Sequence, residues 1–235
     1  MNNEFIKTER IKVGKIPCIV WGEPSDKVYL CVHGKMSDKE SARELAVIAQ
    51  SKGWQTFSFD LPMHGERIHE SERADIFHGI RDLNIIADYV FSHYQKVSLY
   101  ACSLGAYFSL HAYKNRRIEK CLFQSPIVDM KHLIDKMMVW FDITLERLEK
   151  EKEIETPIDL MSWEYYRYVL SHPITEWNIP THILFGGRDD LQSTEVMNDF
   201  AGRFSCNLTV SQDSLHPFIE KGDILVVHKW LSDNL

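Results

Sequence analysis

Cysteine pairs, long apolar runs and an excess of positive charge are all missing from this sequence. Its cysteines are widely spaced and form no C-x-x-C pair, which argues against a disulfide framework or a zinc site and predicts reduced thiols. They are Cys18, Cys31, Cys102, Cys121 and Cys206. No apolar run approaches the roughly 18 residues that span a bilayer, and residues 1–10 contain no apolar signal segment. We therefore expect a cytoplasmic protein without a membrane anchor.

Acidic residues outnumber basic ones by 34 to 27, which gives a formal net charge of −7. A negative protein repels phosphate backbones and anionic membrane surfaces, so we expect neither nucleic acid nor membrane as a partner. The sequence also lacks H-E-x-x-H, G-x-G-x-x-G and P-loop motifs, so no metal or other cofactor is expected. A small neutral or apolar molecule is the expected ligand, and the composition leaves the oligomeric state open.

Short runs rich in β-branched and aromatic residues alternate with helical patterns along most of the chain. The predicted strands are residues 27–32, 54–59, 96–101, 118–123, 181–185 and 206–210. Residues 11–21 predict one or two antiparallel edge strands, and residues 219–231 predict a closing helix. This alternation favours an α/β fold in which helices cover both faces of a mostly parallel sheet, as a three-layer α/β/α sandwich.

Two helices are predicted in the first half of the chain. Ser37 and Glu40 have the spacing of a capping box, ahead of an apolar stripe over residues 42–49. Apolar residues at helical spacing over 80–91 predict the second helix. Both stripes are expected to pack against the sheet.

The alternation stops between residues 129 and 177, where the pattern is helical throughout. We interpret this segment as a helical cap inserted after the sixth strand of a core formed by residues 1–128 and 178–235. Its methionine stripe and aromatic cluster are typical of packing against the core. The alternative is a lid that covers a ligand site and lines an acyl pocket. The residues expected to line that pocket are Met137, Met138, Phe141 and Trp163.

A strand, a sharp turn and a helical pattern follow one another around Ser103. A serine at such a turn takes a strained backbone conformation and tolerates only small residues two positions away, here Ala101 and Gly105. The turn leaves the amide of Leu104 free at a helix N-terminus, where it can donate to developing negative charge. The plainer interpretation is that Ser103 caps the helix. The neighbouring Cys102 is interpreted as buried packing.

Two possible partners of this serine come later in the chain. Asp189 follows the strand at 181–185 and His216 follows the strand at 206–210, so nucleophile, acid and base would run in the order Ser103, Asp189, His216. Serine needs a base to take its proton, and a carboxylate fixes the tautomer of that imidazole. Asp190, which is adjacent, and Asp129, after the preceding strand, remain alternative acids.

Two loops complete the predicted site. Gly34, after the strand at 27–32, permits a close backbone approach, so the amide of Lys35 is a second candidate oxyanion donor. The Lys35 side chain is expected to be solvated. In the loop over residues 60–67, His64 and Arg67 are expected to hold the loop through hydrogen bonds and to take no part in catalysis.

Together these motifs resemble the α/β-hydrolase superfamily. The resemblance rests on H-G at residues 33–34, D-L-P-x-H-G-x-R at 60–67, the turn at Ser103, G-x-x-D at 186–189 and the late His216. The run P-M-H-G-E-R is similar to small bacterial esterases related to the prolyl oligopeptidase group. The chain departs from the usual G-x-S-x-G turn, because Ala101 replaces the first glycine.

The resemblance implies an eight-stranded, mostly parallel sheet and a variable cap. It also implies Ser103 as nucleophile, Asp189 as acid, His216 as base, and the amides of Leu104 and Lys35 as oxyanion hole. The leading hypothesis is a carboxylesterase-like serine hydrolase that cleaves a small ester or thioester through an acyl-enzyme on Ser103. An amidase or peptidase could use the same groups, and a ligand-binding protein without turnover is the alternative from another class.

Overall fold

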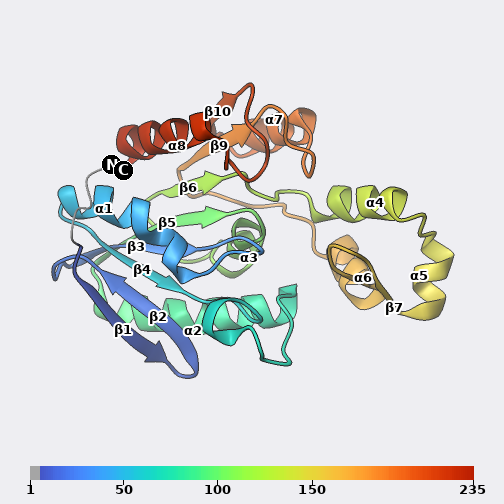
Figure 1. Ribbon diagram of the computed structural model, residues 1–235, viewed down its shortest axis with the longest axis horizontal. Coiled ribbons are helices and arrows are strands. Elements are labelled where there is room, and N and C mark those ends of the chain that lie inside the picture. The colour runs from blue at the N-terminus through green and yellow to red at the C-terminus, as the bar shows by residue number, and fades with distance from the viewer. Residues whose placement is uncertain (1–5) are drawn as a thin grey trace.

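The computed structural model describes residues 6–235 and is built around one large sheet (Figure 1). Residues 1–5 of the predicted core lie outside the described residues. The sheet has eight strands in the order β1-β2-β4-β3-β5-β6-β9-β10. Their bounds are β1 Thr8–Val13, β2 Ile16–Trp21, β3 Lys27–Val32, β4 Gln55–Phe59, β5 Lys96–Cys102, β6 Cys121–Gln124, β9 Thr181–Gly186 and β10 Asn207–Ser211.

The sheet is mostly parallel. Strands β4, β3, β5, β6, β9 and β10 pair in parallel, whereas β2 is antiparallel to both β1 and β4. The predicted architecture is therefore confirmed, and the two antiparallel strands expected over residues 11–21 lie at one edge. Because all six parallel strands run the same way, the loops that follow them meet at one end of the sheet.

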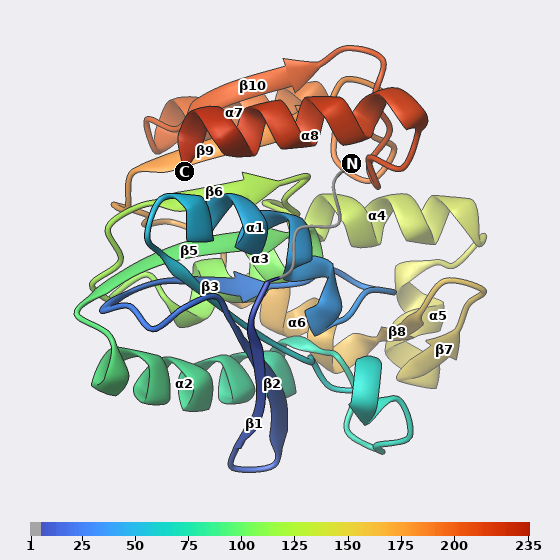
Figure 2. The same cartoon turned by 60° about the vertical axis from the view of Figure 1, so that its left-hand side comes forward.

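Helices cover the two faces of the sheet, as Figures 1 and 2 show. Side chains of β3 alternate between two hydrophobic clusters, with Leu30 in one and Cys31 in the other. Helices α1 (Arg43–Ser51) and α8 (Lys221–Asn234) bury apolar residues in the Cys31 cluster. Helices α2 (Ile76–His93), α3 (Leu104–Ala112) and α7 (Thr194–Arg203) do so in the Leu30 cluster. Each apolar helix stripe is thus removed from water against the sheet.

The capping box expected from Ser37 and Glu40 is wrong. The cap is Asp38, whose side chain accepts a hydrogen bond from the amide of Glu40 and opens a 3₁₀ turn, Lys39–Ala42, ahead of α1. The carboxylate of Glu40 pairs with Arg10 of the edge strand β1. Because Glu40 is paired with Arg10, a residue distant in sequence, its side chain does not complete a capping box.

The inserted segment forms a cap that projects from the end of β6 (Figure 1). Its helices are α4 (Met130–Trp140), α5 (Leu145–Glu151) and α6 (Trp163–Ser171). The expectation of helix alone is wrong, because strands β7 (Glu153–Glu155) and β8 (Leu160–Ser162) form an antiparallel hairpin between α5 and α6. Lys152 has a φ of 68° and ends α5. The hydroxyl of Thr156 accepts from the amide of Asp159 at 3.0 Å and closes the hairpin turn.

Among residues 6–235, no helix combines the length and the apolar content that crossing a bilayer requires.

Two helical glycines predict opposite effects of one substitution. A Cβ at Gly79 of α2 would lie 2.6 Å from the buried ring of Phe108, whereas a Cβ at Gly202 of α7 would meet nothing within 4 Å. We expect Gly79→Ala to lower the free energy of unfolding by about 1–3 kcal/mol, the usual range for overpacking. Gly202→Ala should raise it by up to about 1 kcal/mol through helix propensity. Urea unfolding measures both, and a Gly79→Ala protein as stable as the wild type would contradict the packing described for α2 and α3.

Candidate active site

The turn between β5 and α3 places Ser103 at the carboxyl end of the sheet. Ser103 has φ 49° and ψ −119°, which is the strained conformation that the sequence predicts. A Cβ at Gly105 would lie 2.3 Å from the carbonyl oxygen of His33. Only glycine therefore lets α3 begin this close to the end of β3.

A continuous chain of hydrogen bonds joins Ser103, His216 and Asp189. Ser103 Oγ lies 2.8 Å from His216 Nε2, and His216 Nδ1 lies 2.7 Å from Asp189 Oδ2. Asp189 Oδ1 accepts from the amides of Leu191 and Gln192 at 2.8 and 3.0 Å. The buried carboxylate is therefore fully bonded, and it holds the imidazole with Nδ1 as donor and Nε2 free to accept the serine proton.

The two alternative acids lie elsewhere. Asp129 caps α4, and its carboxylate accepts from the amide of His132 at 2.9 Å. Asp190 is exposed. Of the three candidate carboxylates, Asp189 is the one that bonds to His216.

The loop that carries His216 is held by groups that no sequence motif indicates. A Cβ at Gly186 would lie 2.6 Å from the carbonyl oxygen of Ser214, so glycine is needed where β9 meets this loop. The hydroxyl of Ser125 donates to the carbonyl oxygen of His216 at 2.6 Å. Ser125 has a φ of 44° and follows β6, the neighbour of the serine strand. Its position directly after a strand could have identified Ser125 from the sequence.

Two backbone amides beside Ser103 have no acceptor among residues 6–235. They belong to Leu104, the first residue of α3, and to Lys35 in the loop after β3. A Cβ at Gly34 would lie 3.0 Å from Ser103 Cβ, so this glycine brings the Lys35 loop close to the serine. Both amides are free to donate to negative charge on a bound molecule.

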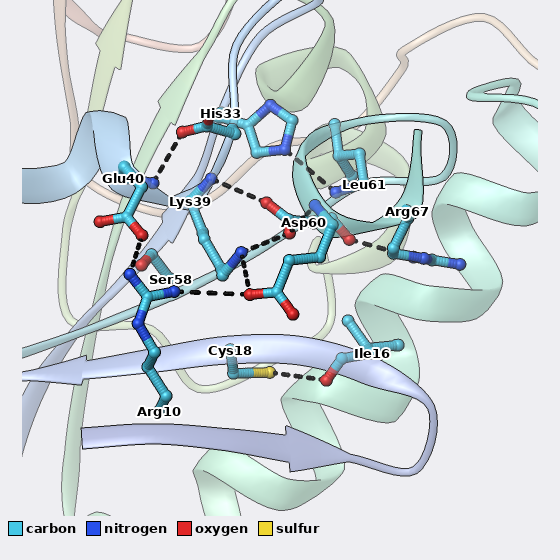
Figure 3. A network of polar contacts seen from close by, with 12 residues as sticks. Arg10, Ile16, Cys18, His33, Lys39, Glu40, Ser58, Asp60, Leu61 and Arg67 are labelled. Carbon is cyan, nitrogen blue, oxygen red and sulfur yellow. Dashed lines mark hydrogen bonds and ion pairs between the residues drawn. The ribbon is translucent and has the colours of Figure 1, made fainter. Parts of the chain in front are cut away.

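Two histidines brace the loop that carries Lys35. His33 Nε2 accepts from the amide of Leu61 at 3.0 Å (Figure 3). Its Nδ1 donates to the carbonyl oxygen of Gly34 at 2.7 Å. His64 Nε2 accepts from the amide of Met36 at 3.1 Å. Burial lowers the pKa of His33 to about 4. His33 is therefore neutral at physiological pH, which its role as acceptor at Nε2 requires.

A buried carboxylate anchors the second loop. Asp60 accepts from Lys39 Nζ at 2.6 Å and from the amide of Glu66 at 2.9 Å (Figure 3). Arg67 Nη1 donates to the carbonyl oxygen of Asp60 at 3.0 Å and to the carboxylate of Asp82 at 2.6 Å. These contacts, with those of His64, confirm that His64 and Arg67 hold their loop through hydrogen bonds.

Comparison with known proteins identifies this architecture. Est1E from Butyrivibrio proteoclasticus, solved with ferulic acid bound, superposes with a TM-score of 0.76 at 15% identity over 96% of both chains. Mouse alpha/beta hydrolase domain-containing protein 10 superposes with a TM-score of 0.76 at 16% identity over 97% of both chains. The chain has the α/β-hydrolase fold. A thioesterase domain from the curacin biosynthetic pathway has a TM-score of 0.60 at 12% identity, over 97% of this chain and 99% of that one.

No protein-family model and no curated protein matches the sequence. The α/β-hydrolase fold therefore rests on the structure, and the relation to the prolyl oligopeptidase group stays a prediction.

The cap is fastened to the loop after β3. Lys35 Nζ donates to the carbonyl oxygen of Ile158 at 2.8 Å and forms an ion pair with Asp159, both in the β7–β8 turn. The Lys35 side chain, expected to be solvated, is 35% exposed and also binds the cap. One residue therefore carries a free amide beside Ser103 on its backbone and a cap contact on its side chain.

Ser103 lines two hollows. The first, which we call the cap cavity, has a volume of about 110 Å³ and is enclosed between Ser103, α4 and the β7–β8 hairpin. The second, which we call the His216 cleft, has a volume of about 760 Å³ and is lined by the loops after β3 and β10 and by α8. Lys35 lines both hollows.

The cap cavity contains one of the four residues expected in an acyl pocket. Met137 lines it, whereas Met138, Phe141 and Trp163 line neither hollow and pack against the main hydrophobic cluster. Trp163 stacks on Tyr166 with ring centroids 5.8 Å apart. The three assignments are corrected, because helical spacing identifies an apolar stripe but not which part of it faces a cavity. The apolar side chains that line the cavity are Ala74, Leu104, Ile127, Met130, Leu133, Ile134, Met137, Leu148, Leu160, Met161 and Leu191.

Other chemistries find little support at this site. Burial raises the pKa of Cys102 to about 12, so its thiol stays protonated and is no rival nucleophile. Within the described part of the chain, no three His, Cys, Asp or Glu side chains are grouped to hold a metal ion.

The neutral state of His33 predicts a pH dependence of stability. Its pKa is about 4 in the folded protein against an ordinary value of 6.5, so the unfolded chain binds more protons between these values. The contribution of neutral His33 to the free energy of unfolding is therefore fully present above about pH 6.5 and is lost as the pH falls toward about 4. We expect His33→Gln to reduce the slope of unfolding free energy against pH by up to about 1.4 kcal/mol per unit.

Urea unfolding at several pH values across this window measures the slope. His69→Gln, at an exposed histidine, is the matched control. An unchanged slope in His33→Gln would show that His33 is protonated in the folded protein or does not titrate on unfolding.

Proposed function

We propose that this protein is a carboxylesterase-like serine hydrolase that cleaves a small-molecule ester or thioester through an acyl-enzyme on Ser103. One observation carries the proposal. The hydrogen bonds Ser103 Oγ–His216 Nε2 at 2.8 Å and His216 Nδ1–Asp189 Oδ2 at 2.7 Å end beside the two unpaired amides of Leu104 and Lys35. This combination supplies an activated nucleophile and a site for developing negative charge.

Each group has a role in the proposed reaction. Ser103 Oγ attacks the carbonyl carbon while its proton passes to His216 Nε2, and the amides of Leu104 and Lys35 donate to the oxyanion. The imidazolium, stabilised by Asp189, then protonates the departing alcohol or thiol, and the acyl-enzyme remains. Water then attacks the acyl-enzyme while His216 Nε2 takes its proton, and the imidazolium returns that proton to Ser103 Oγ as the carboxylic acid is released.

The neighbouring structures agree with this chemistry. One is Est1E with ferulic acid bound, and another is a thioesterase domain. Their identity to this chain is 15% and 12%, so they support the fold, and the proposed reaction rests on the contacts of Ser103.

The cysteines bear on where the protein works. All five are free, and three of them are buried. Unpaired thiols are typical of a reducing compartment. We therefore propose a cytoplasmic location. The proposed partner, which follows from the reaction at Ser103, is a small-molecule acyl substrate.

The test uses p-nitrophenyl acetate and a fluorophosphonate probe. Ser103→Ala should abolish both turnover and labelling, because it removes the hydroxyl that His216 activates. Asp189→Asn should lower kcat by about 10⁴-fold, because the wrong imidazole tautomer is then favoured. His216→Ala should also lower kcat by several orders of magnitude.

Two matched variants serve as controls. Asp129→Asn, at the alternative acid that caps α4, and His228→Ala, in α8, should keep the wild-type kcat within about threefold. A His216→Ala protein with near wild-type rate would overturn the assignment of the base. A wild type that binds ligands but is neither labelled nor active would identify a binding protein.

A further inference from the structure

The position of His216 indicates on which side of Ser103 the leaving group of an ester must lie. The imidazole that takes the proton of Ser103 must later give it to the leaving group, so the leaving group has to lie on the side of His216. His216 and the adjacent Pro217 line the His216 cleft, and neither lines the cap cavity. In the proposed reaction the leaving group would therefore occupy the His216 cleft, which leaves the cap cavity for the acyl group.

The cap cavity is small, and part of its wall is buried within the cap. Its volume of about 110 Å³ is well below the several hundred Å³ of pockets that hold drug-sized ligands. Among its lining side chains, Leu148 is 0% exposed and Met161 is 4% exposed, so both are held within the core of the cap. The contacts of Lys35 with Ile158 and Asp159 keep the hairpin over Ser103. A long acyl chain would have to displace packed side chains.

The His216 cleft is large, and its rim is apolar. Its volume of about 760 Å³ lies within the range of small-molecule sites. Met36 is 90% exposed, Ile219 is 75% exposed and Ile158 is 46% exposed, and all three line this cleft. Exposed apolar side chains gathered at one opening favour an apolar ligand, because its binding removes them from water.

The charges in the cleft disfavour an anion. Lys35 is the one Lys or Arg side chain that lines the cleft within the described residues, and its ammonium already binds Asp159 and the carbonyl of Ile158. Glu44 and Asp190 line the same cleft. A phosphate or carboxylate on the leaving group would find no unpaired Lys or Arg among the described residues that line the cleft. It would meet Asp190 and also Glu44, whose Oε1 lies 3.2 Å from His228 Nδ1.

We propose that the preferred substrate joins a short acyl group to a larger, mainly apolar leaving group without negative charge. This inference rests on the proposed function and adds the substrate class. We expect the rate of hydrolysis to fall as the acyl chain lengthens but not as a neutral alcohol grows. Thioesters whose thiol carries several phosphates are expected to be poor substrates.

The first experiment varies the acyl group on a constant leaving group. We expect kcat/KM for p-nitrophenyl esters to fall by about a hundredfold or more between butyrate and octanoate, because added methylenes no longer fit. Met137→Ala, which removes part of the cavity wall, should raise the octanoate-to-acetate ratio by about tenfold. Met138→Ala, the next residue on the same helix but outside the cavity, should leave that ratio unchanged. Octanoate hydrolysed as well as acetate by the wild type would overturn the proposal.

The second experiment varies charge on a constant acetyl group. The substrates are 4-acetoxybenzamide and 4-acetoxybenzoate, each corrected for its rate of hydrolysis by hydroxide. In the wild type, kcat/KM should be about tenfold higher for the neutral amide than for the carboxylate. The double variant Glu44→Gln, Asp190→Asn removes both cleft carboxylates, so the ratio of the two kcat/KM values should move toward one. Equal rates for the two substrates in the wild type, or a faster reaction of the carboxylate, would contradict the assignment of the cleft.

Labelling of Ser103 separates this inference from the proposed function. A protein that is labelled by the fluorophosphonate probe but prefers long acyl groups or anionic leaving groups retains its function and refutes the substrate class. A protein that is neither labelled nor active with any of these esters refutes both.

Discussion

Ser103 holds a positive φ that non-glycine residues avoid, and the rest of the site is arranged around that conformation. Such a backbone costs about 1–3 kcal/mol and persists only where surrounding contacts determine it. The amide of Ser103 donates to the carbonyl oxygen of Gln124 at 3.2 Å, and its own carbonyl oxygen accepts from Ala106 at 3.1 Å and Ile127 at 3.2 Å. Strand β6 and helix α3 thus hold the residue from both sides. Gly34 and Gly105 then let the neighbouring strand come close enough to place the Lys35 amide beside the hydroxyl.

Much of the fold was predictable from the sequence, because it follows from patterns that are local. The strand at residues 27–32 and the start of the strand at 181 agree with β3 and β9. The association of Ser103, Asp189 and His216 could be anticipated for one further reason. Each residue follows a parallel strand, and the carboxyl ends of parallel strands meet at one edge of a sheet.

The features that the sequence did not reveal depend on distant partners. Glu40 binds Arg10 and so takes no part in a capping box. Lys35 reaches Asp159, which lies in a hairpin turn more than a hundred residues later. Met137 and Met138 are chemically identical neighbours, yet the cavity is lined by the first alone. No periodicity within the segment distinguishes them, because the distinction depends on where the hairpin lies above the helix.

Gln192 links Asp189 to the residue at which the chain enters the cap. Its amide is held by Asp189 Oδ1 at 3.0 Å, and its side chain accepts from the amide of Asp129 at 2.9 Å and donates to the carbonyl oxygen of Asp129 at 3.0 Å. Asp129 is where the chain enters the cap, and Lys35 ties down the far side at Asp159. The cap is thus held to the core at both ends, and of the two hollows lined by Ser103 the larger one lies beside His216.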